Sequence, residues 1–195
     1  MVKIQNAKIQ DAPEIAGLIM EAMNEECCKY FYGPNHNKND FHKFLTALVV
    51  RKDSQYSYVN TLVARDAKGM VTGIAVSYDG ANLTYLRKAF IEGVIDIFGR
   101  DFSHITDETS EGELYLDSFA VLRDFRRLGI GTSLLEATQQ KAFNLHIPYV
   151  GLLVDDENIH ALQYYLRFGF KIKGVNSWGG HAMKHLQIPS QDFTE

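Results

Sequence analysis

The chain has 195 residues, of which 46% are hydrophobic and 23% charged, which suffices for one globular domain with a substantial core. Its formal net charge of -4 gives no basic footprint for a phosphate backbone, so we expect no nucleic-acid partner. No stretch approaches the roughly 18 apolar residues of a membrane span, and the N-terminal residues show no apolar signal core. Cys27 and Cys28 are adjacent and unsuited to an ordinary disulfide. The composition therefore predicts a cytoplasmic domain that does not enter a membrane.

The first residues predict a strand followed by a helix. Residues 3–9 have a strand pattern, and Asp11 is expected to cap a helix whose first turn holds Pro13 and Glu14. The apolar face of this helix is formed by Ile15, Leu18, Ile19, Ala22 and Met23.

The middle of the chain predicts a hairpin and a second helix. Residues 61–65 and 70–78 have strand patterns and flank the turn residues 66–69, which favours a β-hairpin. The helix that follows has its apolar face at Leu83, Leu86, Phe90, Val94 and Ile97.

The second half of the chain alternates strands and helices. The expected elements are a strand at 113–121, a helix at 131–145, a strand at 149–154, a helix at 159–168 and a strand from Lys171 onward. Taken with the first half, this order predicts a mixed α/β sheet.

A basic turn with two glycines joins the strand at 113–121 to the next helix. Gly129 and Gly131 let the backbone approach an anion, and the first free N–H groups of the helix point toward it. Countercharge at the same place comes from Arg123, Arg126 and Arg127. The run predicts a phosphate-binding site, with a plain glycine turn and solvated arginines as the alternative. A Walker A loop needs a lysine before Thr132, and a Rossmann fingerprint needs a third glycine.

Two motifs resemble those of the GNAT acetyltransferase superfamily. Residues 126–131 fit the pattern Gln/Arg-x-x-Gly-x-Gly/Ala at every fixed position, and residues 158–170 match Asn-x-x-Ala-x-x-x-Tyr-x-x-x-Gly-Phe throughout. The resemblance is strong over residues 113–170. It implies an α/β GNAT fold, in which helices flank a mixed central sheet of about six to seven strands. A single domain would cover residues 3–186, with a helical insertion at about 82–112.

The resemblance also implies an N-acetyltransferase that moves an acetyl group from acetyl-CoA to a primary amine by direct attack on the thioester. The acceptor would be a small molecule or a peptide, and neither a metal nor a second cofactor would be needed. Backbone groups of Phe119 and Val121 would pair with the pantetheine arm and the acetyl carbonyl, and Asn158 would contact the pantetheine region. Arg126 or Arg127 would lie beside the pyrophosphate. Backbone N–H groups would hold its oxygens at Leu128, Gly129, Gly131 and Thr132.

Tyr165 holds the tyrosine position of the second motif, and the resemblance makes it the candidate acid that protonates the leaving thiolate. The alternative is a core aromatic residue, because Ala161, Leu162 and Phe168 share its helical face. Tyr164 is one residue out of register and is the poorer candidate.

The base is expected on the strand at 113–121. Alternation with a period of two places on one face Glu113, Tyr115, Asp117, Phe119 and Val121. Asp117 lies nearest the predicted thioester and is the candidate base or amine anchor. A solvated acid, or proton loss through ordered water, is the alternative.

The acceptor site is expected to be shaped by residues 24–60 and 82–112. The first segment holds the aromatic residues Tyr30, Phe31, Tyr32, Phe41 and Phe44. Residues 101–117 hold six carboxylates and no Lys or Arg, so they form either a negative lip that attracts a cationic amine or a solvated acidic loop. His181 and His185 lack neighbouring ligands in the sequence, and we assign no metal.

Two other functional classes remain open. One is a catalytically inactive CoA-binding protein of the same fold that acts as a sensor or scaffold. The other is a protein-interaction domain whose glycine turn binds no nucleotide, against which the clustered arginines argue. A homodimer is compatible with the sequence.

Overall fold

The computed structural model describes residues 2–178 and 181–193. Within these residues, seven strands form one mixed sheet in the order β1-β2-β3-β4-β5-β7-β6, and only β4 and β5 are parallel neighbours. The strands are β1 (Lys3–Asn6), β2 (Thr61–Arg65), β3 (Val71–Asp79), β4 (Glu113–Val121), β5 (Tyr149–Asp155), β6 (Lys171–Trp178) and β7 (His181–Pro189).

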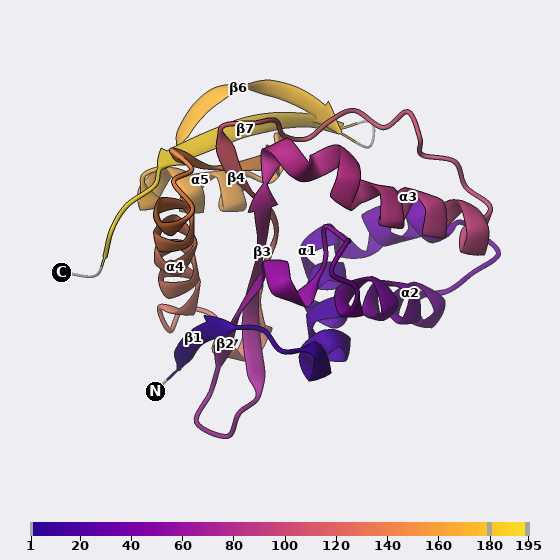
Figure 1. Ribbon diagram of the computed structural model, residues 1–195, viewed down its shortest axis with the longest axis horizontal. Helices are drawn as coiled ribbons and strands as arrows, with labels where there is room; N and C mark the ends of the chain where they lie inside the picture. Colours follow the sequence, from indigo (N-terminus) through magenta and orange to yellow (C-terminus); the bar gives the residue numbers. More distant parts are fainter. Residues whose placement is uncertain (1, 179–180, 194–195) are drawn as a thin grey trace.

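Helices cover both faces of the sheet, which Figure 1 shows between the two layers. One layer contains α1 (Ala12–Tyr32), α2 (Lys38–Val50) and α3 (Leu83–Phe98), and the other contains α4 (Ile130–Asn144) and α5 (Ile159–Phe168). Single 3-10 turns lie at Ile9–Asp11, Tyr58–Asn60, Gly80–Asn82 and Arg123–Phe125. No helix of the described residues is long and apolar enough to cross a membrane. The predicted fold class, a mixed sheet flanked by helices in a single α/β domain, is confirmed.

Most predicted elements are present within a few residues of their expected ends. The hairpin, the helix after it and the strand at 113–121 all form. The first strand is shorter than expected because the chain turns into a 3-10 helix at Ile9.

Asp11 does not cap α1 through its side chain, contrary to the sequence prediction. Its backbone is close to helical (φ -82°, ψ 0°), whereas a capping residue needs an extended conformation for its side chain to reach the first turn. The buried carboxylate instead accepts a hydrogen bond from the N–H of Lys8 at 2.7 Å and pairs with Arg65 of β2. Asp11 therefore ties the start of α1 to the sheet.

Helix α2 was not predicted, although the sequence contains its signals. The side chain of Asn37 accepts hydrogen bonds from the N–H groups of Asn39 and Asp40. The carboxylate of Asp40 in turn accepts one from the N–H of Asn37, and the two residues form a capping box. The apolar spacing typical of a helix follows at Phe41, Phe44, Leu45, Leu48 and Val49.

The aromatic residues expected to line the acceptor site lie mostly in the core. Phe31 and Phe41 are fully buried and stack with ring centroids 6.3 Å apart. Phe31 also contacts Phe90 of α3 edge-on. These rings hold α1, α2 and α3 together and do not line the cavity described below.

Candidate active site

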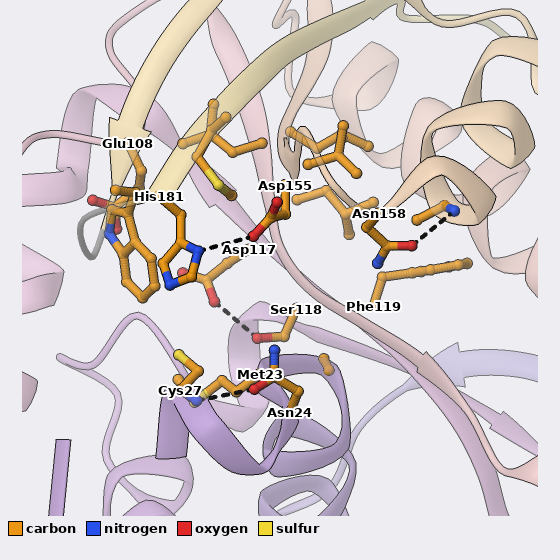
Figure 2. A pocket seen from close by; sticks show the side chains of 18 of the residues that line it. Met23, Asn24, Cys27, Glu108, Asp117, Ser118, Phe119, Asp155, Asn158 and His181 are labelled. Atoms are coloured by element: carbon orange, nitrogen blue, oxygen red, sulfur yellow. Dashed lines mark hydrogen bonds and ion pairs between the residues drawn. The ribbon is translucent and has the colours of Figure 1, made fainter. Parts of the chain in front are cut away.

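The central feature of the site is a split between β4 and β5. The two strands pair over three residues, the last pair being Tyr115 with Gly151, although both strands continue. A cavity of about 300 Å³ lies at the split, with walls from α1, the segment before β2, β4, β5, α5 and β7. Figure 2 shows most of the side chains that line it.

Asp117 lies at a β-bulge where the split opens. On β3, Val76 pairs with Ser118 and the next residue, Ser77, pairs with Leu116, so Asp117 has no partner on that strand. An extra residue shifts the alternation of side chains by one position and bends the strand.

The predicted alternation along β4 is therefore wrong beyond the bulge. Tyr115 faces the α3 side of the sheet, but Phe119 and Val121 pack on the opposite side, with the cluster beneath α4 and α5. Leu114 and Leu116 belong to that same cluster. Asp117 and Phe119 thus do not share a face, contrary to expectation.

The carboxylate of Asp117 is held by neutral donors. Ser118 Oγ donates to Oδ1 at 2.9 Å, and Oδ2 accepts from Gln55 Nε2 at 3.0 Å and from the Tyr78 hydroxyl at 3.2 Å. Removal from water raises the pKa of Asp117 from 3.8 to about 6, while these hydrogen bonds act in the opposite direction. A pKa in this range suits a general base that works near neutral pH.

Glu108, from the loop between α3 and β4, is another carboxylate of the cavity. Its Oε2 accepts from Arg87 at 2.7 Å, and the Tyr78 hydroxyl lies 3.5 Å from its Oε1. Burial and the nearby charge of Asp117 raise the pKa of Glu108 to about 7, against the lowering effect of Arg87. The two carboxyls therefore titrate as a coupled pair.

The predicted negative lip is only partly present, since Glu108 and Asp117 alone among the six carboxylates of 101–117 line the cavity. Glu113 is 2% exposed at the start of β4 and accepts hydrogen bonds from His185 at 2.8 Å and Thr109 at 2.6 Å. Burial acts to raise the pKa of Glu113, but these bonds and one from Gln187 lower it overall. Glu113 therefore links β4 to β7 and does not line the cavity.

Tyr165 enters the cavity from α5. Its ring packs against Phe119, Tyr164 and Phe170, so the residue is a core aromatic and a cavity wall at once. Burial raises the pKa of the phenol well above its ordinary value, and the hydroxyl therefore stays protonated and able to donate. Tyr164 does not line the cavity.

Asn158 has a structural task that the motif did not indicate. Its Oδ1 accepts a hydrogen bond from the N–H of Ala161 at 3.1 Å and so caps α5. The side chain lines the cavity, as does that of Phe119 (Figure 2).

The loop between β4 and α4 has the backbone geometry of an anion nest. Arg127 (φ 63°) and Gly129 (φ 80°) adopt left-handed conformations on either side of Leu128, and α4 begins directly afterwards. Alternating conformations of this kind and a helix N-terminus both direct N–H groups at an anion. A Cβ at Gly131 would lie 2.6 Å from the phenol oxygen of Tyr164, so a larger residue here would force that side chain to shift.

The edge of β4 is open beside this nest. The N–H of Leu122 donates to Thr72 of β3 at 2.8 Å, and alternation then directs the backbone groups of Phe119 and Val121 away from β3, toward the split. These are the two residues predicted to pair with an extended ligand.

Arg126 already has partners within the chain, so it is a poorer candidate for binding the pyrophosphate than the sequence indicated. Its Nε donates to the carbonyl oxygen of Val121 at 2.9 Å, and its Nη2 pairs with Glu21 of α1 at 2.5 Å. The residue ties α1 to the end of β4. Neither Arg123 nor Arg127 forms a side-chain hydrogen bond or ion pair with the part of the chain that the structure describes, so Arg127 is the better candidate for countercharge at the nest.

His181 and Asp155 face each other in the cavity, although the sequence assigned neither of them to the site. Nδ1 of His181 lies 3.3 Å from Oδ2 of Asp155, and both side chains face the cavity (Figure 2). His181 and His185 are not a metal pair, because His185 binds Glu113. Across residues 2–178 and 181–193, no group of three or more His, Cys, Asp or Glu is placed to hold a metal. Asp155 ends a buried strand, a position where ligand-binding residues often lie.

A break in α1 forms another wall. Asn24 has φ 67° and ψ 170°, a region that glycine normally occupies, and its Oδ1 accepts from the N–H of Cys27 at 2.9 Å. Met23, Asn24 and Cys27 border the cavity there (Figure 2). Burial raises the pKa of Cys27 to about 12, so this residue remains a thiol.

The split parallel pair, the nest at its rim and the buried acid in its cavity define the class of protein. The sequence profile of the "Acetyltransferase (GNAT) family" matches residues 20–170, and the chain belongs to this family.

Curated relatives match part of the chain. It is 29% identical over 83 residues to a protein named probable spermine N(1)-acetyltransferase of Bacillus subtilis subsp. natto, which is 42% of this chain and 55% of that protein. An uncharacterized N-acetyltransferase of Methanocaldococcus jannaschii is 34% identical over 79 residues, 40% of this chain and 51% of that protein. The chain spans about half the length of these relatives.

Solved structures match nearly the whole chain. A crystal structure described as an acetyltransferase aligns with a TM-score of 0.77 and 28% identity over 97% of this chain and 100% of that one. An N-acetyltransferase from Staphylococcus aureus Mu50 also aligns with a TM-score of 0.77, at 23% identity over 95% of this chain and 100% of that one, and shares the fold.

Proposed function

We propose that this protein is an acetyl-CoA-dependent N-acetyltransferase that acetylates a primary amine of a small molecule or peptide. The observation that carries the proposal is the placement of Asp117 and Tyr165 in the same split of the sheet whose rim forms the anion nest. Family membership supports it. The proposal includes a cytoplasmic location and a single domain over residues 3–186, with its helical insertion at about 82–112.

The residues of the split fit acetyl-CoA. The nest and the first turn of α4 would hold the pyrophosphate through the N–H groups of Leu128, Gly129, Gly131 and Thr132. Arg127 would supply countercharge. The open backbone edge at Phe119 and Val121 suits an amide-bearing chain that pairs as an extra strand, although Arg126 already occupies one carbonyl of that edge. Asn158 would contact the chain from α5.

In the reaction, acetyl-CoA supplies a thioester whose carbonyl carbon is attacked by the amine. The carboxylate of Asp117 takes a proton from the amine nitrogen as the C–N bond forms. The phenol of Tyr165 gives its proton to the sulfur as the C–S bond breaks, and it regains a proton from solvent. The pKa of Asp117, raised to about 6, suits a base near neutral pH. The raised pKa of the Tyr165 phenol keeps the proton on the hydroxyl until the thiolate forms, although it also makes the phenol a weaker acid.

A cationic acceptor is favoured by the charges of the cavity. Its lining includes Glu108, Asp117 and Asp155, and no Lys or Arg of the described residues contributes to it. The name of the Bacillus relative also directs attention to polyamines. We therefore place polyamines first among the acceptors to be tested, followed by aminoglycosides, amino acids and peptide N-termini.

The test is thiol release from acetyl-CoA in the presence of each amine, with the product identified by mass spectrometry. Acetyl-CoA binding is measured separately by thermal unfolding, where a ligand at ~100 times its dissociation constant adds about 2.7 kcal/mol of stability. Binding with turnover supports the enzyme. Binding without turnover for any amine would instead indicate an inactive CoA-binding sensor or scaffold, and no binding would indicate an interaction domain.

A further inference from the structure

Gln55 lies in the segment before β2 and has a polar atom that the proposed chemistry leaves unused. It is 4% exposed and borders the cavity beside Asp117. Its Nε2 donates to Asp117 Oδ2 at 3.0 Å, but its Oε1 is buried without a hydrogen-bond partner among the residues that the structure describes. Buried polar atoms are normally paired, so an unpaired oxygen at this place points to a donor that binds there.

The position of Gln55 is fixed by its surroundings. Its N–H donates to the carbonyl of Leu86 at 3.2 Å, and its own carbonyl accepts from Asn60 Nδ2 at 3.2 Å. An ionised carboxylate only accepts hydrogen bonds, so the amide nitrogen must face Asp117 and the amide oxygen must point elsewhere. Because Oε1 is bonded to the same carbon as Nε2, it still lies close to the carboxylate that is proposed to meet the amine.

We infer that Gln55 is a specificity-determining residue of the acceptor site: its Oε1 accepts one N–H of the acceptor amine while Asp117 accepts the other, so that the site selects primary over N-alkylated amines. This inference rests on the proposed function.

The chemistry of the amine explains the selection. A neutral primary amine has two N–H groups and one lone pair, so it can satisfy both acceptors and keep the lone pair for the thioester carbon. An N-methyl amine has one N–H, and either Asp117 or Gln55 is then left unpaired beside a methyl group. Sites built to bond an N–H discriminate strongly against analogues that lack it.

The test compares a primary amine found in the acceptor screen with its mono-N-methyl analogue. We measure kcat/KM for both amines with the wild type and with Gln55→Met, which keeps the length of the side chain and removes both polar atoms. The wild type should prefer the primary amine by about tenfold or more, and Gln55→Met should lower this preference about tenfold. The KM for acetyl-CoA should change little.

Ser118→Ala is the matched control. It removes another donor to Asp117, bonded at 2.9 Å, but leaves Oε1 of Gln55 in place. Its rate should fall for both amines in parallel, which keeps the preference for the primary amine. A loss of preference equal to that of Gln55→Met would show that selectivity comes through Asp117, and the inference would be overturned.

The wild type alone provides a second check that does not depend on the folding of a variant. Equal kcat/KM for the primary and the N-methyl amine would overturn the role of Gln55 and leave the acetyltransferase proposal standing. An unchanged preference in a folded Gln55→Met that binds acetyl-CoA would do the same. A wild type that acetylates no amine would refute the proposed function itself, and the inference with it.

Discussion

Replacing Asp117 by Asn should make the protein more stable and nearly inactive at the same time. The substitution keeps the size of the side chain and removes its charge. The carboxylate sits in a cavity among the neutral donors Ser118, Gln55 and Tyr78, and no cation of the described residues forms an ion pair with it. The chain therefore holds a buried charge that folding alone does not favour.

The pKa of Asp117 gives the magnitude. Its rise from 3.8 to about 6 corresponds to about 3 kcal/mol of folding free energy. For an acid whose pKa is raised by folding, this stability is present below the ordinary pKa and lost as pH rises to the folded value. At pH 8 the Asn variant regains these roughly 3 kcal/mol of folding free energy. About 1 kcal/mol is lost again because one amide oxygen replaces two carboxylate acceptors. The net gain of about 2 kcal/mol corresponds to roughly 4–8 °C in Tm.

The assay is urea or thermal unfolding of both proteins at pH 8 and near pH 4, together with thiol release. The gain should be present at pH 8 and absent near pH 4, because the folded carboxyl is then protonated and the unfolded carboxyl is close to its ordinary pKa of 3.8. Turnover should fall by about 100-fold to 10,000-fold. The wild-type rate should increase as pH rises through about 6 to 7, where the coupled pair with Glu108 ionises.

Glu113→Gln is the control, for which we expect a change in stability opposite to that of Asp117→Asn. The pKa of Glu113 is lowered by its hydrogen bonds with His185, Thr109 and Gln187, so its stabilisation is present above its ordinary pKa and lost as pH falls. This variant should be less stable than the wild type at pH 8. If Asp117→Asn were also destabilised at pH 8, or kept wild-type turnover, the reasoning about a desolvated base would be refuted.

Three further predictions concern the donor side of the split. Gly129→Val should raise the Kd for acetyl-CoA at least tenfold by calorimetry, because a left-handed φ of 80° strains a β-branched residue; an unchanged Kd in a folded variant would remove the nest from the site. Tyr165→Phe should lower turnover about 100-fold with little change in KM, whereas Tyr164→Phe should not, and the reverse result would exchange their roles. Arg127→Ala should raise the KM for acetyl-CoA several-fold, while Arg126→Ala should cost up to about 1 kcal/mol of stability through loss of its ion pair with Glu21; equal effects on KM would contradict this division.

The parts of the site built from contiguous residues could be predicted from the sequence. The glycine turn and the helix after it are set by local backbone preferences, so the nest at 126–131 follows from residue order alone. Helix α2 was equally accessible, because Asn37 and Asp40 form a capping box ahead of an apolar face. The local sequence therefore contains enough information to predict α2.

The parts that depend on distant neighbours could not be predicted. Arg126 has the right type and place for a phosphate ligand, but its partner Glu21 lies 105 residues away. Gln55 is bonded to Asp117 across 62 residues, and nothing in its local sequence marks it. The break in α1 at Asn24 also lacks a proline or glycine that would have signalled it.

The bulge at Asp117 brings the proposed base and the proposed acid to the same cavity. In a regular strand, Asp117 and Phe119 would lie on one face, and the ring of Phe119 could not reach α5. The extra residue turns Phe119 toward Tyr165, with ring centroids 6.2 Å apart, while Asp117 keeps its donors on β3 and before β2. The base and the acid are thus drawn from opposite sides of the sheet into one cavity. Deleting one residue at the bulge would restore alternation and separate them, even if every strand still paired.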